Sequence, residues 1–517
     1  MSNNNGYQHQ GLSSSNDDGD QVDSRHPDYI AMGAKYRLIN RILGGRVAMQ
    51  GAGTEYLPMF PNEKEEVYRR RLNNVFINPS FSVAVESHSS KPFSQKIVVE
   101  NHAEDARLAG LINDTDGQGN DLTEFGKRLF VDADQYGMTH ILADFNASEA
   151  VSLQQEREEG NTARLVHIKC LDLFFWDADS NGLTEIRYHR EATVTKGHFG
   201  KKQVKQIVRW LRNSWEVWEQ DQEDAVTVKD TNGKDAKKID PQQTEGWKIT
   251  SSGVNSLGKI PLTTIYFKRT GFMTAEPPNY ELAEVVLEHY QDMSDQKRLE
   301  AIARIGLLTA TGYDPKELEG FSVSSNSLLM AANPDAKMAV VEHSGTAVKV
   351  GRDSLGILED KMEELSLKPE LNRTSGDVTA SEVLSNSFNS MSDLMSWTAA
   401  VETGLHEAFS MAYDFIGASL AEDFKLVVYK DFVVVGNVAD IPSLIQAVDA
   451  GVLSEDVVAF ELKRRGSIDI SHDLTKMRGE INTKAEADRK AAVSDAQALQ
   501  PKEESNEGSS SDSSSTE

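Results

Sequence analysis

Two helical patterns separated by a turn-rich middle, over residues 277–366, constrain the fold of this chain more than any other stretch. The apolar residues of the first pattern recur at i, i+3 and i+4, the spacing of a helix with one buried face: Leu282, Val285, Val286, Met293, Leu299 and Ile302. Prolines at 277 and 278 set its start, because proline fits the first turn of a helix. Glycines, prolines and a Ser/Asn cluster indicate turns over residues 306–345, and helical spacing resumes at Leu355, Leu358, Met362 and Leu365. We therefore expect a stalk of two helices that carries a small head.

A third and longer helical pattern begins after a polar loop that covers residues 367–378. Thr379 and Glu382 have the spacing of a capping box, in which each side chain bonds the backbone N–H of the other residue. Apolar residues then keep helical spacing over residues 384–415. These features predict one long helix that ends at Gly417, followed by a strand or a pair of strands over residues 425–435.

The remaining segments differ in composition. Residues 1–27 are rich in Asn, Ser, Gly and Asp, which predicts a disordered arm. Residues 28–276 mix helical and strand patterns and predict one α+β body, in which Gly137 ends a helix over Leu122–Tyr136. Residues 437–482 predict a small helical unit, and the Ser-rich composition beyond 483 predicts a frayed helix followed by disorder. The expected fold class is α+β.

Composition excludes several classes of protein. A net charge of −27 argues against a protein that grips nucleic acid over its whole surface, since such proteins cluster Lys and Arg. An acidic chain can still place a few cations on DNA or line a passage with carboxylates that repel it, and acidity also favours solubility. We find no run of 18 apolar residues and no apolar signal region, so neither a membrane partner nor secretion is expected. The single cysteine, Cys170, excludes an intramolecular disulfide and is expected to be a buried apolar residue in a strand.

No segment carries a known catalytic or cofactor motif. Glycines at 44, 45, 51 and 53 lack the Gly-Lys-Ser/Thr ending of a phosphate-binding loop. Segments that start at Asp114 and Asp177 imitate a calcium loop, but Phe125 and Tyr188 occupy the position that needs a bidentate glutamate. His289 lies on the apolar face of a predicted helix, where a packed, hydrogen-bonded histidine is the favoured interpretation. We expect no metal, no cofactor and no enzymatic activity, and an α+β enzyme without a recognisable motif is the least favoured hypothesis.

Three consecutive arginines, Arg69, Arg70 and Arg71, lie on a helix predicted over residues 63–76. Consecutive residues point around a helix axis, which favours a solvated face or a contact between subunits. A contact with DNA is the less favoured interpretation.

Several short motifs together resemble the tailed-phage portal proteins, the ring subunits at the DNA-entry vertex of the capsid. The residues that carry the resemblance are Tyr56-Leu57-Pro58 with Glu63, Tyr68 and Arg71-Leu72, Gly258-Lys259-Ile260-Pro261, Pro277-Pro278 with Leu282-Ala283, His289-Tyr290 and Ser294-Asp295, and Thr379-Ala380-Ser381-Glu382. The resemblance rests on the order and spacing of these motifs over residues 28–480. It is to the portal subfamily long described as a phage domain of unknown function.

The resemblance implies a portal fold with named regions. After a disordered arm (1–27), residues 28–276 would form the wing. The stem helices would cover 277–305 and 348–366, with the clip (306–347) between them. The tunnel loop (367–378) would follow, then a long wing helix with a returning strand (379–436), the crown (437–482) and a disordered tail (483–517). In portal rings the tunnel loop projects into the channel. The resemblance therefore implies that Lys368, Arg373 and Thr374 lie near DNA phosphate, and a contact with neighbouring loops or helix ends is the alternative.

The implied function is that of a ring, commonly of twelve subunits, through which double-stranded DNA is packaged and ejected without sequence specificity. The implied partners are other copies of this chain, the terminase large subunit, a head–tail adaptor or connector protein, and the major capsid or scaffold protein. The implied location is the portal vertex of the virion, and the host cytoplasm during assembly. The alternative within the same class is another virion structural protein, such as a capsid or baseplate component.

Overall fold

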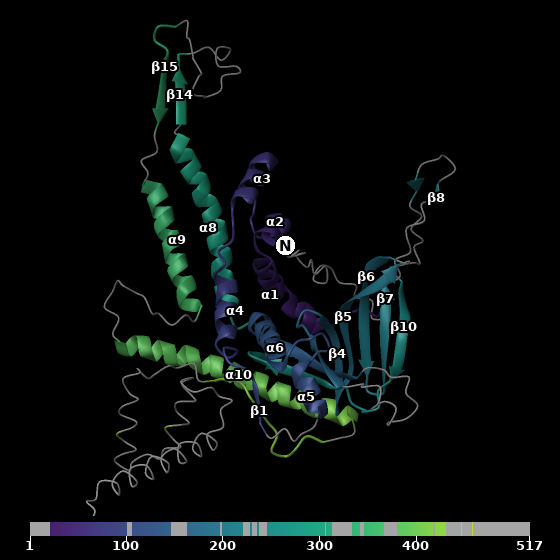
Figure 1. Cartoon of the computed structure of the whole chain (residues 1–517). Helices are drawn as coiled ribbons and strands as arrows, with labels where there is room; N and C mark the ends of the chain where they lie inside the picture. Colours follow the sequence, from purple (N-terminus) through teal and green to yellow (C-terminus); the bar gives the residue numbers. More distant parts are fainter. Residues whose placement is uncertain are drawn as a thin grey trace, which may run out of the picture. The chain divides into compact units, whose positions relative to one another are not determined.

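The computed structural model describes residues 21–100, 106–145, 163–196, 199–220, 228–229, 235–236, 246–305, 307–312, 333–341, 346–366, 380–416 and 419–430, with the single positions 446 and 458. The chain separates into two compact units, residues 1–432 and 433–517. The predicted tunnel loop lies outside the described residues, and so do the predicted crown and tail apart from those two positions. The described part mixes helices with antiparallel sheets, which confirms the α+β class (Figure 1).

Helices dominate the N-terminal part of the first unit. They are α1 (Pro27–Leu43), α2 (Gly45–Ala52), the 3-10 helix η2 (Gly53–Glu55), α3 (Glu65–Asn74) and α4 (Ser80–Ser90). The His26 ring caps α1 by accepting a hydrogen bond from the Asp28 N–H at 3.2 Å, and the helix ends at Gly44. Buried side chains of α1, α2 and α4 form a core with the start of the stalk described below.

A three-stranded antiparallel sheet lies at the centre of the body, with β2 (Met138–Phe145) between β3 (Ala163–Ile168) and β11 (Leu262–Tyr266). Helix α6 (Leu122–Tyr136) precedes β2, and the long helix α10 (Ala380–Ile416) packs against all three strands. The shared core includes Leu129, Phe130, Ile141, Leu165, Ile265, Val401, Leu405 and Phe409. Helix α5 (Ala106–Asn113) adds to this core, and β1 (Val98–Glu100) pairs with β16 (Lys425–Val427). The predicted return of the chain to the body after the long helix is therefore confirmed for β16.

A second antiparallel sheet has the order β10-β7-β6-β5-β4. Its strands are β4 (Leu173–Asp179), β5 (Gly182–Lys196), β6 (Gly200–Leu211), β7 (Ser214–Gln220) and β10 (Trp247–Val254). Phe174, Trp176, Ile186, Ile207 and Trp210 form its buried face. Two short antiparallel pairs are β8 (Val228–Lys229) with β9 (Asp235–Ala236), and β12 (Arg269–Gly271) with β13 (Thr274–Ala275).

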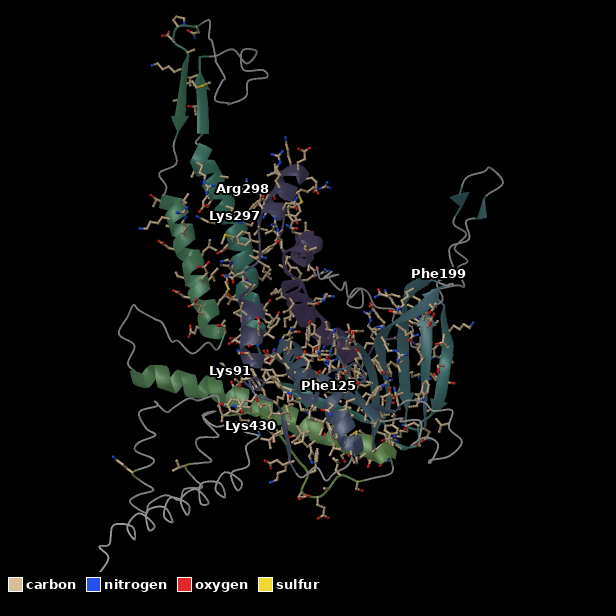
Figure 2. All side chains as sticks on the ribbon, in the orientation of Figure 1. Lys91, Phe125, Phe199, Lys297, Arg298 and Lys430 are labelled. Carbon is tan, nitrogen blue, oxygen red and sulfur yellow. The ribbon has the colours of Figure 1, made fainter. Side chains whose placement is uncertain are left out.

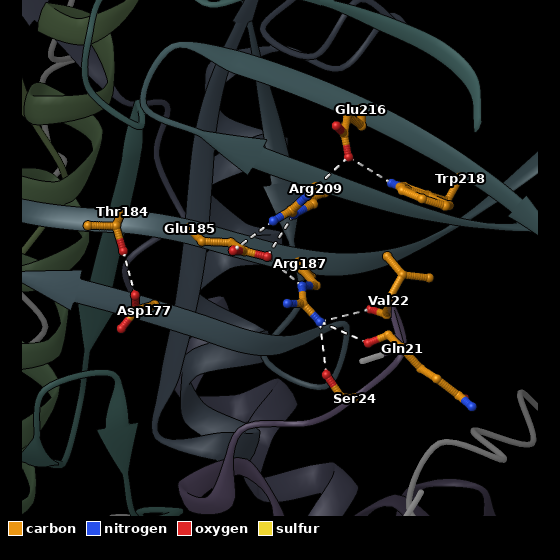
Figure 3. A network of polar contacts seen from close by, with 10 residues as sticks. All are labelled: Gln21, Val22, Ser24, Asp177, Thr184, Glu185, Arg187, Arg209, Glu216 and Trp218. Atoms are coloured by element: carbon orange, nitrogen blue, oxygen red, sulfur yellow. Dashed lines mark hydrogen bonds and ion pairs between the residues drawn. The ribbon is translucent and has the colours of Figure 1, made fainter. Parts of the chain in front are cut away.

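A polar network on this sheet holds the chain segment that precedes α1 (Figure 3). Glu185 accepts hydrogen bonds from Arg187 Nε at 2.6 Å and Arg209 Nε at 2.8 Å. Burial raises the pKa of Glu185, but the hydrogen bonds from Arg209 and Arg187 outweigh it and hold the pKa below the ordinary value. Arg187 Nη1 then donates to the backbone oxygens of Gln21 and Val22, at 3.3 and 3.2 Å.

These contacts correct the predicted arm of residues 1–27. Residues 21–26 lie against the sheet, where Ser24 Oγ accepts from Arg187 at 2.9 Å and the His26 ring stacks on Trp176. The composition of the segment did not reveal this, because the sheet binds mainly its backbone oxygens. Among the described helices, none has the length and apolar content needed to cross a bilayer.

Candidate functional site: a braced helical stalk

The stalk consists of α8 (Tyr280–Ile305) and α9 (Thr346–Leu365), as the sequence predicts. Its polar contacts join His289 Nε2 to Glu359 Oε1 at 3.2 Å, Gln296 Nε2 to the Val348 oxygen at 2.9 Å, and Arg352 Nε to Glu300 Oε1 at 2.9 Å. The first half of α8 contacts the second half of α9, and the second half of α8 contacts the start of α9, so the helices are antiparallel. His289 is buried and hydrogen-bonded, which confirms the predicted structural role of this histidine.

The described part of the head continues the stalk as a β-hairpin (Figure 1). Strand β14 (Leu307–Thr311) follows α8, and β15 (Lys337–Val341) returns toward α9. Leu307 pairs with Val341 and Thr311 pairs with Lys337. Residues 313–332 and 342–345 lie outside the described part, so the predicted clip is seen only where it joins the stem.

A buried ion pair braces the stalk from the side of α3. Arg71 donates to Glu63 twice, from Nη2 at 2.8 Å and from Nε at 3.1 Å, and their side chains are only 7% and 2% exposed. Arg71 Nη2 also donates to the Pro58 oxygen at 2.6 Å, and Nη1 reaches Ser294 Oγ on α8 at 3.3 Å. The hydrogen bond from Arg71 is the main reason why the pKa of Glu63 lies below its ordinary value. We call Glu63, Arg71 and their contacts on α8 the brace.

Cations on α3 and α8 extend the brace by stacking on aromatic rings. The guanidinium groups of Arg71 and Arg298 lie 4.3 and 4.7 Å from the centre of the Phe60 ring. Lys297 Nζ lies 3.9 Å from the centre of the Phe76 ring (Figure 2 labels Lys297 and Arg298). Such contacts between a cation and the face of a ring are attractive. They fix the distal half of α8, residues 291–305, against the segment around α3.

The brace corrects one prediction about the three arginines. Arg69 is exposed and pairs with Glu65 four residues earlier, as a solvated face requires. Arg71 instead lies inside the protein and holds Glu63 and Ser294. The sequence contained a signal for this role, because the motifs that carry the portal resemblance include Glu63, Arg71 and Ser294, three residues that the structure brings together.

A second buried pair fixes the base of the stalk. His88 on α4 lies between Asp134 Oδ2, 3.0 Å from Nδ1, and the Ser366 oxygen, 3.1 Å from Nε2. The His88 ring is therefore held between two buried oxygen atoms, one on α6 and one at the end of α9. Asn279 Nδ2 donates to the other oxygen of Asp134 at 2.8 Å. The pair therefore ties the residue before α8 and the residue after α9 to the body.

The surroundings of α8 leave one of its sides open. Successive residues turn by about 100° around a helix. One side of α8 faces α9 and carries His289, Gln296 and Glu300. The side about half a turn around the helix faces the brace and carries Gln291, Ser294 and Arg298. The body side carries Leu282, Ala283, Val286 and Tyr290. On the fourth side lie Glu281, Glu284, Glu288, Asp292, Asp295 and Leu299, all exposed except the half-buried Asp292. We call this row the acidic stripe.

The predicted DNA-contacting residues Lys368, Arg373 and Thr374 lie outside the described residues. The described chain stops at Ser366 beside His88 and resumes with α10 at Ala380. The contacts of these three residues therefore stay a prediction.

The other residues singled out in the sequence have structural roles. Cys170 is buried, as predicted, but it follows the end of β3 rather than lying in a strand, and its N–H donates to Asp132 at 2.9 Å. Asp179 Oδ1 accepts a hydrogen bond from the Asn181 N–H at 2.7 Å in the turn between β4 and β5, so the segment that imitates a calcium loop is a hairpin turn. In the described part of the chain, we find no group of three or more His, Cys, Asp or Glu side chains placed to hold a metal ion.

Comparisons with known proteins give one family match and several solved structures. A family model described as "Domain of unknown function (DUF4055)" matches residues 278–416, from the start of the stalk to the end of α10. A comparison with curated proteins found no match.

Among solved structures, the chain is similar to one titled "Neck of empty GTA particle computed with C6 symmetry", with a TM-score of 0.40 and 11% identity over 73% of this chain and 87% of that chain. A second, "Virion of native gene transfer agent (GTA) particle", has a TM-score of 0.40 and 14% identity over 81% and 97%. A third, "Neck of native GTA particle computed with C12 symmetry", has a TM-score of 0.39 and 12% identity over 81% and 98%.

Proposed function

We propose that this chain is a portal-type ring subunit of a virion, and that its stalks surround a passage for duplex DNA. The acidic stripe carries this proposal. It places five carboxylates along one side of α8, from Glu281 to Asp295, on a helix whose other sides contact α9, the brace and the body.

An acidic wall suits a passage for DNA. DNA binders gain affinity by neutralising phosphates with Lys and Arg, and a row of carboxylates does the opposite. Repulsion between like charges keeps phosphates off the wall, so the polymer can move without binding. The wall must also stay in place under load. The brace and the His88–Asp134 pair support this requirement, because each joins α8 to the body through buried, hydrogen-bonded groups.

The proposal assigns a role to each other region. The head at the end of the stalk would bind the terminase large subunit during packaging and a head–tail adaptor afterwards. The loop over residues 367–378 would project into the passage with Lys368, Arg373 and Thr374, and the outer body would meet the major capsid or scaffold protein. The chain would act mechanically at the portal vertex and carry out no chemistry.

Electron microscopy of the purified protein, with light scattering for mass, tests this proposal. We expect rings with a central hole and a mass of about twelve times the 57.2 kDa of one chain. Replacement of Glu281, Glu284 and Glu288 by lysine should leave the rings intact and lower the amount of DNA packaged in an assembly assay. A compact monomer under all conditions, including co-expression with the capsid and scaffold proteins, would contradict the proposal.

A further inference from the structure

The stalk has two flanks that lie on opposite sides of α8. Helix α9 covers the side that carries His289 and Gln296, and the segment around α3 covers the side that carries Ser294 and Arg298. The two covering segments therefore flank α8 on opposite sides.

The outer face of α9 combines apolar residues with acidic ones. Val350 and Ile357 are 64% and 69% exposed, one heptad apart, and so lie on the same side of the helix. Leu355, Leu358 and Met362 are buried on the side toward the core. Asp353, Asp360 and Glu364 are exposed around Val350 and Ile357, together with one lysine, Lys361, so the face carries an excess of negative charge. This face would place two large aliphatic side chains in water if no partner covered it.

The flank at α3 combines apolar residues with basic ones. Val67 is 46% exposed, Phe76 is 53% exposed, and Val47 on the adjoining helix α2 is 81% exposed. The exposed cations around them are Arg46, Lys64, Arg69, Arg70 and Arg298, with Lys297 half-buried over Phe76. Glu65 and Glu66 are the acidic residues of α3. The flank is therefore apolar with an excess of positive charge, the complement of the face on α9.

Both flanks stand at the same height along α8. Val348 and Arg352 on α9 meet Gln296 and Glu300. On the other side, Arg71 meets Ser294, and the Asn74 oxygen meets Lys297 Nζ at 2.8 Å. A ring requires this arrangement, because rotation about an axis parallel to α8 moves a surface sideways without changing its height. Contacts at different heights would generate an open helix of subunits instead.

We propose that the outer face of α9 in one copy of this chain docks on the α3 flank of the next copy. Ile357 and Val350 then pack against Val67 and Phe76, and Asp353 and Asp360 lie near Arg70 and Arg46. The contact is head to tail, so every copy uses both flanks and no apolar flank stays exposed in a closed ring. The inference rests on the proposed function only in requiring that copies of this chain assemble.

This contact would leave the acidic stripe uncovered. The stripe lies on a side of α8 that faces neither α9 nor the brace, so two neighbours can occupy the flanks without touching it. In a closed ring the stripes of all copies then point in the same radial direction. Arg71 and Arg298 act electrostatically on Asp295 at the distal end of the stripe, so the part from Glu281 to Asp292 is the part that the contact would leave facing the passage.

Cysteine cross-linking tests the contact directly. The natural Cys170 is fully buried, so thiol reagents meet little background. The full-length Ile357→Cys/Val67→Cys protein, treated with short bis-maleimides, is expected to give a ladder of covalent oligomers up to the ring. A co-assembled mixture of the two single variants should stop at covalent dimers, because each chain then offers only one half of the contact. Each single variant alone should remain monomeric on a denaturing gel, since like residues do not meet head to tail.

The outcomes separate this inference from the proposed function. A ladder in a sample that shows rings supports both. Rings without a ladder, with linkers of several lengths, would overturn the contact and leave the portal proposal standing. A ladder of open oligomers without rings would support the contact and count against the portal proposal. Monomers without any ladder would overturn both.

A charge exchange provides the independent test. Asp353→Lys with Asp360→Lys should prevent assembly, and adding Arg70→Glu with Arg46→Glu should restore it. The matched control is Glu281→Lys with Glu284→Lys, which makes the same change in charge on the acidic stripe and should leave assembly unchanged. Equal effects of the two lysine pairs, or no restoration by the glutamates, would show that net charge rather than this contact controls assembly.

Discussion

Replacement of Arg71 by methionine should release the distal half of α8 from the body. Methionine has a similar length but no charge, so the Glu63 carboxylate, 2% exposed, loses its ion-pair partner. Removal of one partner from a buried pair costs about 3–5 kcal/mol. We expect about 3 kcal/mol, the lower end, because Glu63 keeps its hydrogen bond from the Phe60 N–H at 3.1 Å.

Amide hydrogen exchange with mass spectrometry measures this effect where it occurs. About 3 kcal/mol corresponds to roughly a hundredfold larger population of the open state. Peptides from residues 291–305 should therefore exchange about a hundredfold faster in Arg71→Met. Peptides from residues 280–290 should change little, because Leu282, Val286 and Tyr290 bury that half in the core.

Two further variants show whether the ion pair is the cause. Arg70→Met makes the same chemical change at the neighbouring exposed position and should shift stability by less than about 0.5 kcal/mol. Glu63→Gln added to Arg71→Met removes the unpaired charge and should recover part of the protection. Equal exchange in Arg71→Met and Arg70→Met would refute the assignment of Arg71 to the brace.

Three other predictions concern the body. Gly137→Ala should lower the unfolding free energy by more than about 2 kcal/mol in urea denaturation. Gly137 has φ +89°, and an added Cβ would lie 2.3 Å from the Glu276 oxygen. The control Gly110→Ala, in α5 with open space around it, should be neutral or stabilising. His88→Leu should cost about 1–3 kcal/mol by the same measurement, because it removes the hydrogen-bond partner of the buried Asp134 and Ser366 oxygens. An unchanged urea midpoint would contradict the assigned contacts. Because the pKa of Glu185 is lower in the folded protein, this group contributes stability above its unfolded pKa of about 4.3, and the contribution is lost as pH falls below that value. Glu185→Gln should therefore flatten the acid side of a plot of unfolding free energy against pH. A curve identical to that of the natural protein would contradict this.

The sequence predicts elements whose information is local. Apolar spacing marks α8, α9 and α10, and the glycine after Tyr136 marks the end of α6, because helix geometry and the left-handed conformation act over a few residues. One part of this pattern misleads. Leu299 continues the apolar spacing of α8, yet it is 40% exposed and lies on the acidic stripe. Spacing shows which residues share a side, and it does not show where the core that covers that side ends.

The contacts that support the stalk could not be predicted from spacing, because they join distant parts of the chain. Arg71 and Ser294 are 223 residues apart, and His88 and Ser366 are 278 residues apart. A polar residue carries no mark of its partner until the fold brings the two together. Arg71 illustrates this, since Arg69, Arg70 and Arg71 are chemically identical and only one of them is buried.

The two halves of α8 are held by different forces, and this division bears on how a stalk of this kind can work. Residues 280–290 contribute Leu282, Val285, Val286 and Tyr290 to the core, so their position follows from apolar burial. The buried residues described in the distal half are Ser294 and Gln296, whose hydrogen bonds join α8 to Arg71 and to α9. Apolar burial weakens gradually with displacement, whereas a hydrogen bond depends steeply on distance and direction. The distal half should therefore hold its position rigidly until its polar contacts break, and then move as a unit with the start of α9, residues 346–352, and the hairpin of β14 and β15. The proximal half and the rest of α9, which buries Leu358 and Met362, stay packed in the body.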